Sequence, residues 1–126
     1  MEPISRRQFL TRTSIAGAAI TVAPSLFAQN ANRKIVAAVM GTNSRGMAHV
    51  KSLLELPDVE IGYICDVDDR AIEKATKYLA GKQGKAPKIV KDFRHALDDK
   101  DVDVLTIAAP NHWHAPATIL ACSAGK

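Results

Sequence analysis

The sequence is poor in cysteine and in aromatic residues, and both shortages exclude classes of protein. Two cysteines cannot build a disulfide framework, and no C-x-x-C pair indicates a zinc site. No run reaches the roughly 18 uninterrupted apolar residues of a membrane span. With 47% hydrophobic, 24% charged and 5% aromatic residues, the composition is typical of a globular α/β domain and not of a disordered chain or a membrane bundle.

The net charge of +4 is unevenly distributed along the chain. Residues 1–28 hold three arginines and one glutamate, which leaves 14 basic and 12 acidic residues for the remainder. A surplus so small and so widely spread is not the footprint of a nucleic-acid-binding protein. We therefore expect no nucleic-acid partner.

The first 28 residues have the pattern of an export signal. Ser5-Arg6-Arg7-Gln8-Phe9-Leu10 is similar to the twin-arginine motif S-R-R-x-F-L-K, with Thr11 in place of the final lysine. A mildly apolar run over 15–27 and a small residue, Ala28, follow. We predict a signal peptide over 1–28, a polar lead-in over 29–33, a periplasmic or secreted protein and no stable membrane anchor. The alternative is an amphipathic N-terminal helix that packs on the domain.

From residue 34 onward, strand patterns alternate with helix patterns. The first strand is a continuous apolar run, as expected of a strand buried on both faces. Alternation of this kind implies a parallel sheet, because parallel neighbours need a long return connection. We predict one α/β domain with a doubly wound parallel sheet over 34–126. The predicted strands are 35–40, 59–65, 88–90 and 102–108, and the predicted helices are 44–56, 69–80, 93–97 and 114–124.

The turn between the first strand and the first helix is Gly41-Thr42-Asn43-Ser44-Arg45-Gly46. It matches the dinucleotide-binding pattern G-x-G-x-x-G at the first and third glycines and carries Asn43 at the second. The first glycine allows a tight turn, and the third allows close packing of helix on strand. The helix N-terminus presents N–H groups and a positive dipole end to a pyrophosphate. Alternatively, the glycines only allow the chain to turn and are not part of a binding site.

Asp66 ends the second strand, 20 residues after Gly46. A carboxylate at this spacing accepts hydrogen bonds from the adenosine ribose in dinucleotide-binding folds. Because it would repel a 2′-phosphate, it favours NAD, although Arg45 and Arg70 lie near enough in the sequence to accommodate NADP. Alternatively, Asp66 is a surface acid or a helix-capping acid that binds no ligand.

The fourth predicted strand leads into the most specific stretch of the chain, Thr106-Ile107-Ala108-Ala109-Pro110-Asn111-His112-Trp113-His114-Ala115-Pro116-Ala117-Thr118. Together with Ala124-Gly125-Lys126, it resembles the glucose–fructose oxidoreductase / inositol dehydrogenase (Gfo/Idh/MocA) family, whose fourth strand ends in P-N-x-x-H and is followed by a helix ending in A-G-K. The resemblance covers about residues 33–126 and implies a Rossmann NAD(P)-binding domain.

The resemblance also implies roles for individual residues. Gly41 to Gly46 would hold the pyrophosphate and Asp66 the adenosine ribose. Pro110, Asn111 and His114 would line the nicotinamide side, and Trp113 would lie against the cofactor or the substrate mouth. Other interpretations of this stretch stay open: His112 and His114 could form a metal pair, without a third ligand nearby, and Trp113 could simply anchor the last helix. Cys65 and Cys122 are expected to be buried free thiols.

Members of the family continue into a fifth strand bearing H-V-x-x-E-K-P and into a substrate domain, neither of which this chain contains. The resemblance therefore implies the N-terminal part of an exported oxidoreductase that transfers hydride between a sugar-like alcohol and nicotinamide, homo-oligomeric when complete. No catalytic residue is assigned, and we expect the 126-residue chain alone to be inactive. The alternatives are an NAD-dependent glycosidase of the same family and a non-catalytic nucleotide-binding or sugar-sensing protein.

Overall fold

The computed structural model describes residues 33–126, and the predicted signal peptide and residues 29–32 of the lead-in lie outside it. The described part contains a parallel four-stranded sheet in the order β3-β2-β1-β4. This is the predicted α/β fold of Rossmann type. The strands are β1 (Ile35–Met40), β2 (Val59–Cys65), β3 (Lys88–Val90) and β4 (Val104–Ile107), and the helices are α3 (Ser44–Leu54), α4 (Asp69–Leu79), α5 (Arg94–Leu97) and α6 (Asn111–Ser123).

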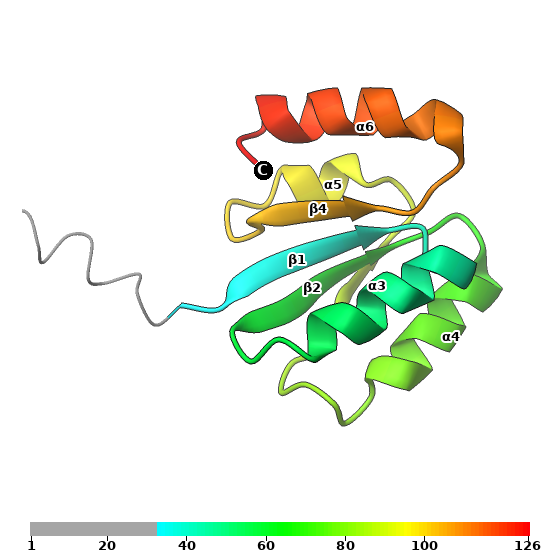
Figure 1. The fold of residues 1–126 in the computed structure, drawn as a ribbon, viewed down its shortest axis with the longest axis vertical. Coiled ribbons are helices and arrows are strands. Elements are labelled where there is room, and N and C mark those ends of the chain that lie inside the picture. Colours follow the sequence, from blue (N-terminus) through cyan, green and yellow to red (C-terminus); the bar gives the residue numbers. More distant parts are fainter. Residues whose placement is uncertain (1–32) are drawn as a thin grey trace, which may run out of the picture. The chain divides into compact units, whose positions relative to one another are not determined.

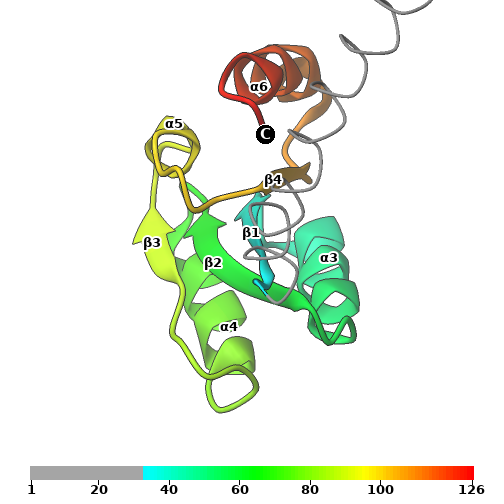
Figure 2. The ribbon, with the colours of Figure 1, turned by 90° about the vertical axis from the view of Figure 1, so that its left-hand side faces the viewer.

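Helices cover both faces of the sheet (Figure 1). The view turned by 90° shows α3 and α4 on one side and α5 and α6 on the other (Figure 2). The first side is a cluster of large aliphatic residues that includes Val39, Val50 and Ile64, all completely buried. On the second side, Phe93 and Leu97 pack with Ala117 and Ala121 of α6. β1 packs against apolar residues on both of its faces, which explains why its sequence is continuously apolar.

Local signals placed most element boundaries correctly. The ranges predicted for β1, β2 and β3 are confirmed, and α4 begins after Asp68, whose side chain accepts a hydrogen bond from the backbone N–H of Arg70. The predicted start of the last helix at residue 114 is wrong, because α6 begins at Asn111. Pro116 therefore lies in its second turn and not in its first. The fourth strand is also shorter than predicted, spanning Val104–Ile107.

The sheet brings the carboxyl ends of all its strands to one edge, because the strands are parallel. β1 lies between β2 and β4, so the connections from β1 and β4 diverge there, which makes this edge the switch point at which open α/β sheets bind ligands. No helix in the part that the structure describes is long and apolar enough to cross a membrane.

Candidate functional site

A pocket of about 420 Å³ opens at the carboxyl edge of the sheet. All four strand ends contribute to it, so residues that are far apart in the sequence meet around one space. The lining residues are Met40, Gly41 and Asn43 after β1, Cys65, Asp66 and Val67 after β2, Lys91, Asp92, Phe93 and Arg94 after β3, and Ala108, Ala109, Pro110 and Trp113 after β4.

Two glycines are sterically required in the turn that follows β1. Gly41 has φ +82°, and a Cβ there would lie 2.8 Å from the carbonyl carbon and oxygen of Ala108. At Gly46 a Cβ would lie 1.8 Å from the carbonyl oxygen of Gly41. Both positions therefore need glycine for close approach of the turn, the first helical turn and the β4 exit. The geometry accounts for the first and third glycines of the pattern.

Asn43 occupies the position of the missing second glycine. Its φ is −75°, so it does not use the left-handed conformation that asparagine tolerates, and it makes no side-chain cap on α3. It is exposed and lines the pocket. Ser44 and Arg45 are exposed in the first turn of α3, whose N–H groups have no acceptor within the helix. This turn presents a positive dipole end and backbone donors near the pocket.

Asp66 lines the pocket and is held by its neighbours. Its Oδ2 accepts hydrogen bonds from the backbone N–H of Thr42 at 2.7 Å and from the Thr42 hydroxyl at 3.1 Å. Its Oδ1 accepts from the N–H of Asp68 at 3.0 Å. Thr42 itself is completely buried, so its side chain orients Asp66 and does not face the pocket.

Three cations of the segments that follow β2 and β3 are paired with carboxylates. Arg70 donates from Nε and a terminal nitrogen to the two oxygens of Asp68, at 3.1 and 3.0 Å. The Arg70 hydrogen bond lowers the pKa of Asp68. After β3, Lys91 pairs with Asp69 at 2.9 Å and Arg94 with Asp92 at 3.0 Å. These pairs leave the Asp66 side of the pocket with little net positive charge.

The residues after β4 divide into two groups. Pro110 and Trp113 line the pocket, and Trp113 packs edge-on against Phe93 with ring centroids 6.1 Å apart. Asn111 and His114 are exposed on α6 and are not among the lining residues. The His114 Nε2 lies 3.0 Å from the carbonyl oxygen of Ala109, which it can bind as a donor.

Sequence reasoning missed the segment after β3. Lys91, Asp92, Phe93 and Arg94 form one wall of the pocket, although only a short strand precedes them. The signal that could have found them is their position directly after a parallel strand, at the same edge as Asp66. Among the described residues, no group of three or more His, Cys, Asp or Glu could hold a metal ion.

The two thiols differ in environment. Cys65 is buried under the pocket, and burial, together with Asp66 and Asp92, raises its pKa to about 12. It is therefore a neutral thiol near pH 7 and not a thiolate nucleophile. The expectation that Cys122 is buried is wrong: α6 buries only a narrow alanine stripe against the sheet, and Cys122 lies outside it and is exposed.

No family model matches the chain. Among curated proteins, it is 34% identical to a glycosyl hydrolase family 109 protein of Stenotrophomonas maltophilia over 99% of the chain and 29% of the relative. It is 31% identical to a protein of the same description from Parabacteroides distasonis over 96% of the chain and 30% of the relative. The chain thus spans about 30% of the length of these relatives.

Solved structures share the fold. An NAD-binding protein from Listeria innocua matches with 26% identity and a TM-score of 0.64, over 75% of this chain and 26% of that one. Scyllo-inositol dehydrogenase from Lactobacillus casei, solved with NAD(H) and scyllo-inositol, matches with 20% identity and a TM-score of 0.65, over 75% of this chain and 26% of that one. The chain belongs to the Gfo/Idh/MocA family. The family predicted from the sequence is thereby confirmed. In this structure the P-N-x-x-H stretch follows β4 and begins α6.

Proposed function

We propose that this chain is the NAD-binding portion of an exported Gfo/Idh/MocA oxidoreductase, which transfers hydride between a sugar-like alcohol and nicotinamide. The observation that carries the proposal is the pocket itself, in which a glycine turn at a helix N-terminus and a held carboxylate meet at the switch point of a parallel sheet. Structural neighbours described as NAD-binding support the choice of nucleotide.

The residues present fit a dinucleotide. A Cβ at Gly41 or Gly46 would close the turn against backbone atoms, so the turn is shaped for close approach. The backbone N–H groups of the first turn of α3 would hold the pyrophosphate, whereas those of Gly41 and Thr42 already donate to Cys65 and Asp66. Asp66 would accept from an adenosine ribose hydroxyl. When bound, NAD supplies a hydride acceptor at nicotinamide C4. Pro110 and Trp113 line the pocket and would face the nicotinamide side. Asn111 and His114 are exposed on the first turn of α6, and the family resemblance alone assigns them to the same side.

Preference for NAD follows from the charges around Asp66. A 2′-phosphate would meet a carboxylate whose neighbouring cations are already paired with Asp68, Asp69 and Asp92. Arg45 is the remaining cation of the glycine turn that could receive it. We therefore propose that the chain binds NAD more tightly than NADP.

Calorimetric titration of NAD and NADP tests this proposal. Asp66→Ala is expected to weaken NAD binding by roughly 1–3 kcal/mol, because hydrogen-bonding groups lose their partner, and to weaken NADP binding less. Asp58→Ala is the matched control, since Asp58 is exposed just before the opposite end of the same strand. Failure of the unmodified protein to bind NAD would reject the function, and equal losses for both nucleotides would reject the role of Asp66.

A second candidate is an NAD-dependent glycosidase. The descriptions of the curated relatives favour it. Two are glycosyl hydrolase family 109 proteins, and a third, at 29% identity, is an alpha-N-acetylgalactosaminidase of Shewanella oneidensis. With the protein carrying its substrate domain, NADH formation from added sugar would support the oxidoreductase. Release of an aglycone from a glycoside without net NADH would support the glycosidase. Nucleotide binding with neither reaction would indicate a sensor.

Export belongs to the proposal as well. It rests on Ser5-Arg6-Arg7-Gln8-Phe9-Leu10 and the mildly apolar run after it, which lie outside the described residues. The twin-arginine route moves folded proteins, which suits an enzyme that takes up its nucleotide in the cytoplasm. Replacing Arg6 and Arg7 together by lysine should retain the precursor inside the cell. Normal export of that variant in cell fractionation would reject the twin-arginine route.

We further propose that the complete protein forms a homo-oligomer. Its sedimentation in the analytical ultracentrifuge tests this.

A further inference from the structure

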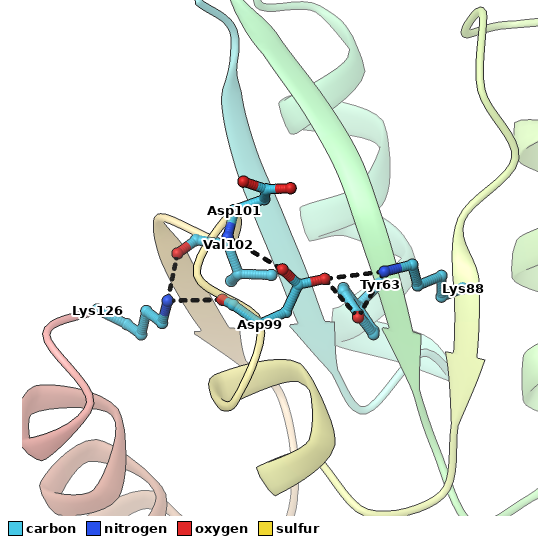
Figure 3. Close-up of polar contacts among 6 residues, drawn as sticks. All are labelled: Tyr63, Lys88, Asp99, Asp101, Val102 and Lys126. Carbon is cyan, nitrogen blue, oxygen red and sulfur yellow. Dashed lines mark hydrogen bonds and ion pairs between the residues drawn. The ribbon is translucent and has the colours of Figure 1, made fainter.

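Lys126 joins the end of α6 to the start of β4 (Figure 3). Its Nζ donates hydrogen bonds to the carbonyl oxygens of Asp99, at 2.8 Å, and Val102, at 2.7 Å. These two carbonyls belong to the turn that leads from α5 into β4, in which the N–H of Val102 also donates to Asp99. The ammonium therefore closes the β4–α6 unit at the edge of the sheet opposite the pocket.

Within the described residues, α6 buries little apolar surface. Of its 13 residues in the described structure, two are buried, Ala117 and Ala121, and both have small side chains. Ile119 and Leu120 are 65% and 40% exposed. By comparison, α4 buries four residues, including Ile72 and Leu79. Because apolar burial anchors a helix in proportion to area, α6 depends more than α4 on polar contacts at its ends.

The turn that Lys126 binds is itself fixed to the sheet (Figure 3). The Oδ2 of Asp99 accepts from the hydroxyl of Tyr63 on β2 at 2.7 Å and from the Nζ of Lys88 on β3 at 2.8 Å. Its Oδ1 accepts from the N–H of Asp101 at 3.0 Å. Tyr63 is buried. The carbonyl acceptors of Lys126 therefore sit on a turn tied to two strands.

The other end of α6 forms part of the pocket, through Pro110 just before the helix and Trp113 in its first turn. α6 is one helix from Asn111 to Ser123, so a displacement of its C-terminal end would also displace its first turn. We propose that Lys126 is a positioning residue, which sets the place of α6 and thereby of the wall formed by Pro110 and Trp113. The effect on nucleotide affinity rests on the proposed function, whereas the effect on Trp113 does not.

Trp113 provides a direct readout, because it is the one tryptophan of the sequence. Lys126→Met keeps most of the aliphatic stem and removes the ammonium. We expect the Trp113 emission to shift to longer wavelength, its quenching by acrylamide to increase, and NAD affinity to fall about tenfold. Lys126→Arg, which retains N–H donors, should restore both. Lys100→Met is the matched control, since Lys100 is an exposed lysine of the accepting turn.

A Lys126→Met protein that is less stable but keeps wild-type Trp113 emission and NAD affinity would overturn the proposal, because Lys126 would then be only structural. If that variant does not fold, Asp99→Ala is the second test: it leaves Lys126 in place and removes the carboxylate that ties the turn to β2 and β3. A folded Asp99→Ala protein with unchanged Trp113 emission would likewise overturn it. If the unmodified protein does not bind NAD, the Trp113 shift alone decides the positioning role.

Discussion

Thr42 donates its backbone N–H and its hydroxyl to the same oxygen of Asp66, at 2.7 and 3.1 Å. The side chain of Thr42 therefore does not enter the pocket. It instead holds the Asp66 carboxylate, which lines the pocket. The glycine turn and the end of β2 are therefore one unit, in which a change at Thr42 acts on Asp66.

Thr42→Val removes the hydroxyl from this unit while nearly preserving side-chain shape. Because the site is completely buried, we expect a loss of about 1 kcal/mol in the free energy of unfolding, the usual contribution of one such hydrogen bond. Thr42→Ser should lose less, since it keeps the hydroxyl. Urea denaturation measures both, with the exposed Thr118→Val as control. Equal stabilities for the Val and Ser variants would contradict the importance of the hydroxyl.

Gly46→Ala should be severely destabilising. The added Cβ would lie 1.8 Å from the carbonyl oxygen of Gly41, so the turn must move, and we expect a loss of about 3 kcal/mol or more together with loss of NAD binding. Gly84→Ala is the matched control, because nothing lies within 4 Å of a Cβ there, and it should change stability by less than about 0.5 kcal/mol. Thermal and urea unfolding check both, and a stable Gly46→Ala protein would show that the turn can relax.

Asp68 controls whether Arg70 is available. Asp68→Ala removes both oxygens that bind the Arg70 guanidinium, so we expect a gain of a few-fold in NADP affinity relative to NAD, as is usual for one exposed charge. The same change also removes the side-chain cap of α4, so stability should fall slightly. Titration of both nucleotides measures the ratio. Adding Arg70→Ala should cancel the gain, and a gain that persists would have another cause.

The Asp99 cluster predicts a pH dependence of stability. Hydrogen bonds from Lys88 first, and then from Tyr63, hold the pKa of Asp99 well below its ordinary value of 3.8, while Asp99 and Tyr63 hold the pKa of Lys88 above 10.5. A lowered acid pKa stabilises the fold above the unfolded value and loses that effect as the pH falls through the folded one. A raised lysine pKa acts in the opposite sense, so the stabilisation is complete between about pH 4 and pH 10.

Asp99→Asn should therefore be less stable than the unmodified protein at pH 7 and should lose less stability on acidification below pH 4. Urea unfolding measured across acid pH tests this, with Asp58→Asn as a control because Asp58 lies outside the cluster. Parallel acid profiles for Asp99→Asn and the unmodified protein would remove Asp99 from the explanation.

The order of strands and helices was readable from the sequence because its signals are local. Apolar runs ended by Gly41 or Pro57 define β1 and α3, and Asp68 begins α4 as a side-chain cap. The spacing of the two glycines is also local, and Gly46 is required by its approach to Gly41 within one strand–helix connection. The close approach at Gly41 is to Ala108 after β4, which is a tertiary contact. The start of α6 escaped this reading: Pro116 suggests a first-turn proline, but the helix tolerates it one turn later.

Which side chains meet was decided only by tertiary structure. The order β3-β2-β1-β4 is set by pairing between strands distant in the sequence, and it is this order that places the segment 91–94 beside Asp66 and Trp113. The hydrogen bonds of Thr42 to Asp66 span 24 positions, and those of Lys126 to Asp99 and Val102 span 27 and 24. Residue spacing determines periodicity and turns, whereas these contacts depend on the register and packing of the assembled sheet, which no local pattern encodes.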